Sequence, residues 1–255
     1  MSDQPVIVSE ADGIITITLN RPQAKNAVNK AVAEGVSNAL DKLESDSALR
    51  VAIITGAGGT FCSGMDLKAF VSGETPVIEG RGFAGLCEHT LSKPLIAAVE
   101  GYALAGGFEI AISSDLIVAA EDATFGIPET KRGLVAGAGG LVKLPKQVSP
   151  RIAKELALTG DFFTSSRAYE LGLINRVVPS GTALEEATVL ARKIANNGPL
   201  AVSVSKQVID GAQDWSNATM FAEQAVLMEP IFNSEDAIEG ATAFAEKRAP
   251  VWKGR

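Results

Sequence analysis

The sequence has few of the residues on which metal sites and nucleophilic sites depend. Among its 255 residues there is one histidine, His89, and there are two cysteines, Cys62 and Cys87. Zinc sites need several Cys, His or carboxylate ligands at set spacings, so we expect no metal site. Two cysteines make no disulfide framework in a chain of this length, which favours a reducing compartment.

Nucleophilic and nucleotide-binding motifs are also missing. A serine or cysteine nucleophile needs a base, but His89 falls on a segment predicted to be helical and no Gly-x-Ser-x-Gly turn accompanies it. Residues 59–64 are followed by Met65-Asp66, not by the Lys and Ser or Thr of a P-loop. The segment Gly56-Ala57-Gly58 lacks the third glycine of a dinucleotide-binding turn. We therefore set these chemistries aside.

Positive charge is in deficit and long apolar runs are absent. The chain has 23 basic and 30 acidic residues, a net charge of −7, which repels phosphate backbones and anionic lipids. The longest apolar runs, 95–99 and 116–120, are far shorter than the roughly 20 residues of a membrane-spanning helix. No secretory signal is visible at residues 1–5. We expect a cytoplasmic protein with no nucleic-acid or membrane partner.

The remaining sequence predicts one α/β core with a helical appendage. Alternation and short apolar runs predict strands at 6–8, 14–19, 51–55, 95–99, 116–119 and 174–178. Helices are predicted at 26–43 with Asn26 as cap, from 66, at 83–91, at 108–113, after 137–140, at 150–159 and from a Ser165 cap to Gly172. Every signal beyond about residue 182 is helical, and 196–199 resembles a hinge. We expect a core at 1–195 and a helical region at 196–255.

The helices of this tail carry apolar faces. Such a face either packs against the protein's own core, which is the commoner case, or forms a subunit interface. The residues concerned are Ala218, Phe221, Ala225, Leu227 and Met228 on one helix, and Ile238, Ala241 and Phe244 on another.

Two glutamates stand in unusual settings. A glutamate on a helix is ordinarily solvated, but Glu109 lies between Gly106-Gly107-Phe108 and Ile110-Ala111-Ile112. Glu129 follows Pro128, whose fixed φ suits the start of a helix or turn. The two positions indicate an acid/base pair rather than surface residues.

The glycines near these glutamates indicate a site for an anionic oxygen. The Gly106 peptide N–H, at the start of a predicted helix and without a Cβ, can donate to such an oxygen and gain from the helix dipole. The turn Ser63-Gly64-Met65-Asp66 places the Met65 N–H at the start of another helix. Two such donors would stabilise an enolate formed from a thioester.

Six stretches of the chain resemble, together and in this order, the crotonase or enoyl-CoA hydratase/isomerase superfamily. The resemblance covers almost the whole length. The stretches are Leu19-Asn20-Arg21-Pro22 with Lys25-Asn26-Ala27, Phe61-Cys62-Ser63-Gly64-Met65-Asp66-Leu67, residues 93–103, Gly106-Gly107-Phe108-Glu109, Phe125-Gly126-Ile127-Pro128-Glu129 and Gly137-Ala138-Gly139-Gly140.

The resemblance implies a crotonase-like α/β fold, a spiral of ββα turns with a helical C-terminal region for trimerisation. It also implies homotrimers or hexamers, an acyl-CoA substrate and no tightly bound cofactor. The superfamily's oxyanion hole would match the peptide N–H groups of Met65 and Gly106. Because hydratases carry both glutamates, Glu129 would protonate Cα, Glu109 would activate the attacking hydroxyl, and the Gly137 N–H would help hold the water.

The same resemblance assigns residues to coenzyme A. For the two lysines among them, exposure to solvent without any ligand is an equally good interpretation. The assigned residues are Lys25 and Ala27 along the adenine and pantetheine, Ser63, Met65, Asp66 and Leu67 near the adenine-side loop, and Lys247 at the phosphates with Phe244 beside it, from a neighbouring subunit.

Several alternatives stay open. Ala105 and Phe108 depart from the commonest hydratase pattern, and residues 70–85 resemble the variable region that shapes the acyl site, so the acyl group is not specified. Within the superfamily, the alternatives are an isomerase, a carnitinyl-CoA-type dehydratase, a dehalogenase and a thioester hydrolase. A catalytically idle acyl-CoA-binding or RNA-associated protein is a further alternative, which the intact glutamates and the net negative charge disfavour.

Overall fold

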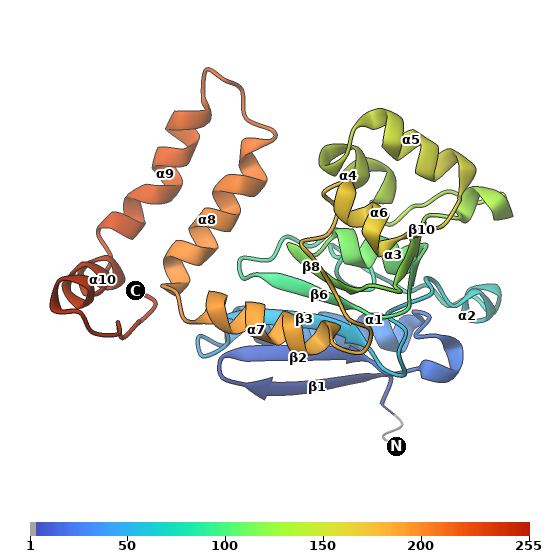
Figure 1. Cartoon of the computed structure of the whole chain (residues 1–255), viewed down its shortest axis with the longest axis horizontal. Helices are drawn as coiled ribbons and strands as arrows, with labels where there is room; N and C mark the ends of the chain where they lie inside the picture. The colour runs from blue at the N-terminus through green and yellow to red at the C-terminus, as the bar shows by residue number, and fades with distance from the viewer. Residues whose placement is uncertain (1–3) are drawn as a thin grey trace.

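A mixed six-stranded sheet forms the centre of the computed structural model, which describes residues 4–255. The outer pair, β1 and β2, is antiparallel, and the other neighbours are parallel. Figure 1 shows the sheet with helices on both sides. Its order is β1 (Val6–Ala11), β2 (Ile14–Leu19), β3 (Val51–Gly56), β6 (Leu95–Val99), β8 (Leu116–Ala120) and β11 (Arg176–Val178).

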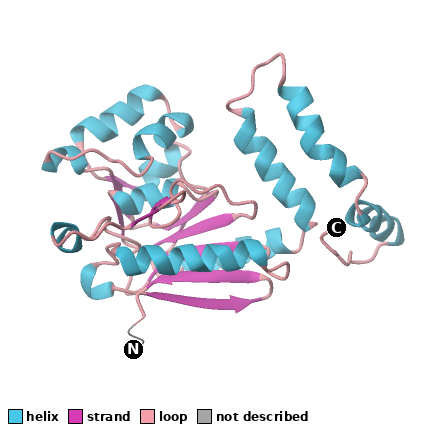
Figure 2. Ribbon diagram, turned by 180° about the vertical axis from the view of Figure 1, so that it is seen from behind, coloured by secondary structure: helices cyan, strands magenta, loops and turns pink. Residues whose placement is uncertain are grey.

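The central strands are apolar throughout because both faces of the sheet are covered. On β3, Val51 and Ile53 face one apolar cluster while Ala52 and Ile54 face the other. Helix α1 (Lys30–Ser45) covers one face, and α7 (Ala183–Ala195) covers the opposite one (Figures 1 and 2). The face of α7 that meets the sheet is made of alanines, which allow close approach: Ala183, Ala187, Ala191 and Ala195.

A second, small sheet lies beside the first and completes the predicted spiral. It has the order β10 (Phe163–Thr164), β9 (Thr124–Gly126) and β7 (Tyr102–Leu104). The chain passes from β6 to β7 and into α3 (Gly106–Ile112), and then from β8 to β9 and into the 3₁₀ helix η2 (Glu129–Arg132). These ββα turns confirm the predicted fold class.

The spiral stacks equivalent positions of successive turns. Cys62 forms a parallel bridge with Ala103, and Ala103 is the partner of Phe125 in the small sheet. Three residues beyond these aligned positions lie Met65, Gly106 and Pro128. The turns that lead into α2 (Leu67–Val71), α3 and η2 are therefore brought to the same region, although the three segments are far apart in the sequence.

The remaining elements surround this core. The N-terminal part adds η1 (Pro22–Ala24), α2 (Leu67–Val71), β4 (Val77–Ile78) and β5 (Gly82–Phe83). Helices α4 (Gly140–Gln147), α5 (Pro150–Thr159) and α6 (Ser165–Glu170) follow η2. The C-terminal helices are α8 (Pro199–Ala212), α9 (Met220–Phe232) and α10 (Glu235–Glu246), and Figure 1 shows them standing away from the sheet.

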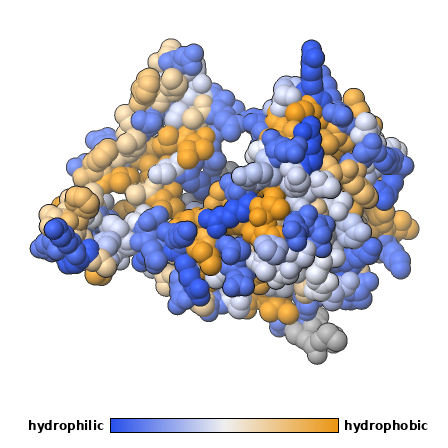
Figure 3. Space-filling view, in the orientation of Figure 1, coloured by the Kyte–Doolittle hydropathy of each residue, from blue (hydrophilic) through white to orange (hydrophobic). Residues whose placement is uncertain are grey.

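The C-terminal helices do not bury their apolar faces in this chain. Neither α8 nor α9 has a buried residue, and Phe221, Ile238 and Phe244 are largely exposed. Figure 3 shows apolar side chains gathered along these helices. The expectation that these faces pack against the core is wrong for the three residues, so the alternative of a subunit interface remains a prediction.

Three local predictions are also wrong, because turns or caps fall at other residues. No helix covers 83–91: β5 enters the segment, and positive φ at Ala84 and Gly85 prevents a helix. Helix α1 begins at Lys30 with Asn29 as its cap, whereas Asn26 is buried with φ 55°. Thr164 caps α6 in place of Ser165, the first helical residue.

Ala105 is a strained residue in the turn that leads into α3. Its φ of 52° and ψ of −128° belong to a region that glycine tolerates and alanine does not. Such strain destabilises the native state by about 1–3 kcal/mol. Replacing alanine by glycine removes the strain but raises the entropy of the unfolded chain, which costs about 0.5–1 kcal/mol. We therefore expect Ala105→Gly to raise the free energy of unfolding by about 1 kcal/mol, measured by chemical denaturation.

A matched control is Ala103→Gly, two residues earlier in β7. Ala103 is fully buried and is not among the residues with positive φ, so its loss of a methyl group should destabilise the protein. If Ala105→Gly lowers stability as Ala103→Gly does, the turn is not strained.

Candidate active site

Two peptide N–H groups at this stacked position are free to bind a ligand. Val28 donates to the Gly64 carbonyl at 2.8 Å, and Asp66 donates to the Val28 carbonyl at 2.9 Å. Because neighbouring peptides in an extended segment point in opposite directions, the Met65 N–H points away from Val28. Gly106 begins α3, so its N–H has no acceptor within the helix. Within residues 4–255, neither N–H meets an acceptor.

Glycines allow these two turns to touch. A Cβ on Gly64 would lie 3.2 Å from the Gly106 nitrogen, and a Cβ on Gly107 would lie 2.2 Å from the Cys62 carbonyl oxygen. On the other side, the Phe83 ring would lie 2.6 Å from a Cβ on Gly106. The structure thus brings the two predicted oxyanion donors into adjacent turns and leaves no room for side chains between them.

Glu109 lies within the core beside these turns and is held by backbone donors. Its side chain projects from α3, and the residue is 2% exposed. The peptide N–H groups of Ala138 and Gly140 both donate to its Oε1 at 2.8 Å. Burial raises the pKa of the Glu109 carboxyl, and these two donors and the Lys143 ammonium partly oppose that rise.

Glu129 begins η2, directly after Pro128, and has an unused carboxylate oxygen. Its Oε2 is buried and receives no hydrogen bond from any residue in the described range 4–255. Burial raises the pKa of the Glu129 carboxyl, and the negative charge of Glu109 raises it further. The two glutamates therefore interact, as the sequence predicts, and one of them has an oxygen available to a ligand.

Because the pKa of Glu129 is raised, its ionised carboxylate should lower the free energy of unfolding at neutral pH. The native protein holds this proton more tightly than the unfolded chain, so stability falls as pH rises from the unfolded pKa through the native one. We expect Glu129→Gln to unfold at a higher temperature than wild type at pH 7. The difference should vanish below about pH 4, where the carboxyl is protonated in both states. Thermal scans at both pH values test this, and equal midpoints at pH 7 would contradict it.

The donors to Glu109 were not identified from the sequence. The resemblance implies that the Gly137 N–H helps to hold the water, and the N–H groups of Ala138 and Gly140 contact Glu109. A Cβ on Gly137 would meet only the Val135 carbonyl, at 3.8 Å, so this peptide borders open space. The signal was present in the Gly139-Gly140 pair, since a Cβ on Gly140 would lie 3.0 Å from the Glu109 Oε1.

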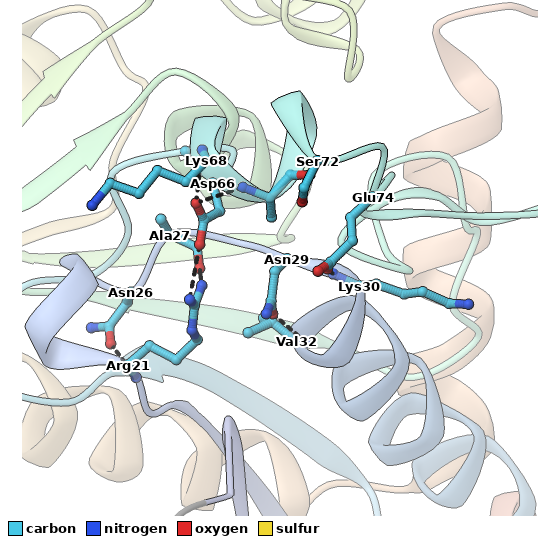
Figure 4. A network of polar contacts seen from close by, with 12 residues as sticks. Arg21, Asn26, Ala27, Asn29, Lys30, Val32, Asp66, Lys68, Ser72 and Glu74 are labelled. Carbon is cyan, nitrogen blue, oxygen red and sulfur yellow. Dashed lines mark hydrogen bonds and ion pairs between the residues drawn. The ribbon is translucent and has the colours of Figure 1, made fainter.

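Arg21 organises the loop that was assigned to the adenine side, and Figure 4 shows the contacts. Its guanidinium donates to the Ala27 carbonyl at 2.6 Å and to the Asp66 carboxylate at 2.8 Å. Asp66 also caps α2, accepting from Lys68 and Ala69. Burial alone would raise the pKa of Asp66, but Arg21 and these N–H donors lower it overall. Asp66 is thus occupied by internal contacts, and the sequence reasoning missed Arg21.

Other residues assigned to coenzyme A lie along the same edge. Ser63 donates from its N–H to the Lys25 carbonyl at 3.0 Å, and the Lys25 ammonium lies 5.2 Å from the centre of the Tyr102 ring. Leu67, at the start of α2, is 46% exposed. The structure therefore groups Lys25, Ser63 and Leu67 beside Met65, on the surface.

Phe244 and Lys247 are not brought to this site within one chain. They belong to α10 and its C-terminal cap, which lie at the opposite end of the molecule from α2 (Figures 1 and 2). Phe244 is 87% exposed. A role in binding coenzyme A would require them to come from a neighbouring subunit.

The cysteines and the histidine offer no nucleophilic site. Cys62 and Cys87 are buried, and burial raises the pKa of both thiols to about 12. Burial and the nearby Arg81 lower the pKa of His89. Among the described residues, no three or more His, Cys, Asp or Glu side chains are grouped to hold a metal ion. In the same range, no helix is long and apolar enough to cross a membrane.

Comparisons with known proteins agree with this geometry. The chain is 44% identical to the carnitinyl-CoA dehydratase of Salmonella typhi over 250 residues, 95% of each chain. A solved enoyl-CoA hydratase from Mycobacterium tuberculosis H37Rv is 58% identical, with a TM-score of 0.97 over 99% of this chain and 100% of that one. A carnitinyl-CoA hydratase from Mycobacterium avium is 45% identical, with a TM-score of 0.79 over the whole of both chains.

The family match covers nearly the entire described chain. The enoyl-CoA hydratase/isomerase family matches residues 9–255, which include Met65, Gly106 and both glutamates. The resemblance in the sequence motifs is thereby confirmed, and this chain belongs to the enoyl-CoA hydratase/isomerase family of enzymes, within the crotonase superfamily.

Proposed function

We propose that this protein is an enoyl-CoA hydratase, which adds water syn to a trans-2-enoyl-CoA and forms a 3-hydroxyacyl-CoA. The observation that carries the proposal is the pair of glutamates: Glu109 is buried, Glu129 is half-buried with a buried and unpartnered Oε2, and the charge of Glu109 raises the pKa of Glu129. Isomerases of the superfamily generally keep a glutamate matching Glu129 and replace the one matching Glu109. The presence of both favours hydration.

The thioester carbonyl oxygen would bind between the Met65 and Gly106 N–H groups. Attack at Cβ moves negative charge onto this oxygen as the enolate forms, so two donors already in place stabilise the transition state more than the ground state. The close approach of the two turns, which the glycines permit, supports this role. Loss of one such donor typically costs about 10²–10³-fold in rate.

One water molecule would supply the hydroxyl group, and its other proton would replace the proton that Glu129 delivers to Cα. Glu109 as carboxylate accepts a proton from the water, and the hydroxide oxygen bonds to Cβ. Glu129 as carboxylic acid gives its proton to Cα, and the proton on Glu109 then passes to Glu129, which restores the starting state. Each turnover therefore adds the elements of one water across the double bond. The unpartnered Oε2 of Glu129 is the atom available for this transfer.

The pair must therefore hold one proton during hydration. Burial raises the pKa of both carboxyls, and their mutual repulsion favours the singly protonated pair. The rate should fall on the acid side as Glu109 takes up a proton, and on the alkaline side as Glu129 loses its own.

Coenzyme A enters as part of the substrate, with no separate tightly bound cofactor. The edge that carries Lys25, Ala27, Ser63, Asp66 and Leu67 would contact its adenine and pantetheine, with Lys25 and Leu67 exposed and Ala27 buried. Phe244 and Lys247 would complete the site from a neighbouring subunit. The exposed apolar side chains of α9 and α10 support a subunit interface, and the proposed assembly is a homotrimer or a hexamer built from two trimers. The proposed location is the cytoplasm.

Carnitinyl-CoA dehydratase is the second candidate. It is favoured by relatives of that name, which are 43–44% identical over 95% of each chain. Dehydration is the reverse of the same reaction and uses the same two glutamates, so the candidates differ only in the acyl group.

A panel of enoyl-CoA thioesters distinguishes the candidates. Straight-chain, branched, aromatic, steroid side-chain and crotonobetainyl thioesters are each mixed with the enzyme, and loss of the enoyl absorbance is followed. Hydration of at least one member supports the proposed activity, and a preference for crotonobetainyl-CoA supports the second candidate. Binding of the panel without turnover would contradict both.

A further inference from the structure

Helix α4 supplies one of the donors to Glu109, yet it is a weak element by itself. Its N-cap, Gly139, has φ 100° and provides no side-chain hydrogen bond, and Pro145 inside the helix has no N–H to donate. Leu141 and Val142, in its first turn, are 43% and 67% exposed. Something other than local helix stability must therefore fix Gly140 at hydrogen-bond distance from Glu109.

The Lys143 side chain makes that connection. It runs along the turn before α4, and its ammonium donates to the Cys87 carbonyl at 2.7 Å and to the Ser113 hydroxyl at 2.8 Å. The Ser113 hydroxyl in turn donates to the Glu109 carbonyl oxygen at 2.7 Å. These contacts close a ring through Glu109: from its side chain to Gly140, along α4 to Lys143, through Ser113 and back to its own backbone.

The ammonium also acts on Glu109 through its charge. Burial lowers the pKa of Lys143, and the nearby negative groups raise it. The charged or titratable groups that face it are Cys87 from the loop before β6, Glu109 from α3, Asp115 from the turn before β8 and Lys206 from α8. Its positive charge in turn lowers the pKa of Glu109.

We propose that Lys143 is a positioning residue for Glu109, which holds the Gly140 donor in place and contacts no substrate. This inference rests on the proposed function, in which Glu109 must be a carboxylate. A second measurement, described below, tests the ring without requiring activity.

The test compares Lys143→Met with Lys146→Met, one turn further along α4. Lys146 is exposed, and within residues 4–255 its ammonium pairs with Asp214 alone. Because a misplacement of about 1 Å can cost about 10²-fold, we expect Lys143→Met to lower kcat by about 10- to 100-fold. KM should be unchanged.

The acid limb of the pH profile of Lys143→Met should move to higher pH, because Glu109 then holds its proton more tightly. Lys146→Met should match wild type, and Lys143→Arg, which keeps the charge, should retain the wild-type acid limb.

Hydrogen exchange followed by mass spectrometry provides the readout that needs no activity. Peptides covering 136–142 should exchange faster in Lys143→Met and not in Lys146→Met.

If wild type hydrates nothing in the panel, the proposed function fails, whereas the exchange result still tests the ring. The inference is overturned if Lys143→Met has the kcat, the acid limb and the exchange rates of wild type. It is also overturned if Lys143→Met and Lys146→Met lose kcat equally. If Lys143→Met does not fold, Ser113→Ala decides: faster exchange with lower kcat supports the ring, and wild-type behaviour overturns it.

Discussion

Glu129→Gln is expected to lower kcat for hydration by about 10²–10⁴-fold, the usual contribution of a positioned acid or base. The amide has the size of the carboxyl but cannot deliver a proton to Cα. KM should change little, because the groups assigned to coenzyme A lie on the edge around Lys25 and Ser63. Initial rates over a range of substrate concentrations give both constants.

The control for this variant is Glu121→Gln, which changes an exposed carboxylate just after β8. It should hydrate at the wild-type rate. A Glu129→Gln enzyme within a few-fold of wild type would mean that another group protonates Cα.

Glu109→Gln is expected to have a loss of similar size, about 10²–10⁴-fold, for a different reason. The substituted side chain still has an oxygen for the N–H groups of Ala138 and Gly140, so the site should keep its shape. The glutamine amide, however, cannot accept a proton from water. Binding of coenzyme A thioesters, measured by calorimetry, should remain close to wild type.

The two variants can be separated by proton exchange at Cα of a saturated acyl-CoA in D₂O. Glu129 alone serves this exchange in the proposed mechanism, so Glu109→Gln should retain it and Glu129→Gln should lose it. Loss of exchange in Glu109→Gln and retention in Glu129→Gln would reverse the assigned roles.

The central strands were predictable because their signal is local. Residues 51–55, 95–99 and 116–119 are short apolar runs, and a strand covered on both faces requires such a run. The segment 83–91 shows the limit. It has apolar residues at helical spacing, but φ is positive at Ala84 and Gly85, and a Cβ on Gly85 would lie 2.7 Å from the Ala33 carbonyl oxygen, so the close contact with α1 and not the local pattern decides the structure.

The site was predictable where glycine or proline marks it. Gly106, the Met65 turn and Pro128-Glu129 each have a backbone feature that is visible in the sequence, and the spiral brings these segments together. Contacts that depend on how distant segments pack left no such signal. Arg21 meets Asp66 across 45 residues, and Lys143 reaches Ser113 across 30.

The stereochemistry of hydration in D₂O tests most directly whether the two glutamates act from the same face of the substrate. A trans-2-enoyl-CoA that the enzyme accepts is hydrated in D₂O, and NMR of the 3-hydroxyacyl product gives the relative configuration of the deuterium at Cα and the hydroxyl at Cβ. Glu109 and Glu129 acting together from one side predict syn addition, with both groups on the same face. Anti addition, or a mixture of the two, would contradict it.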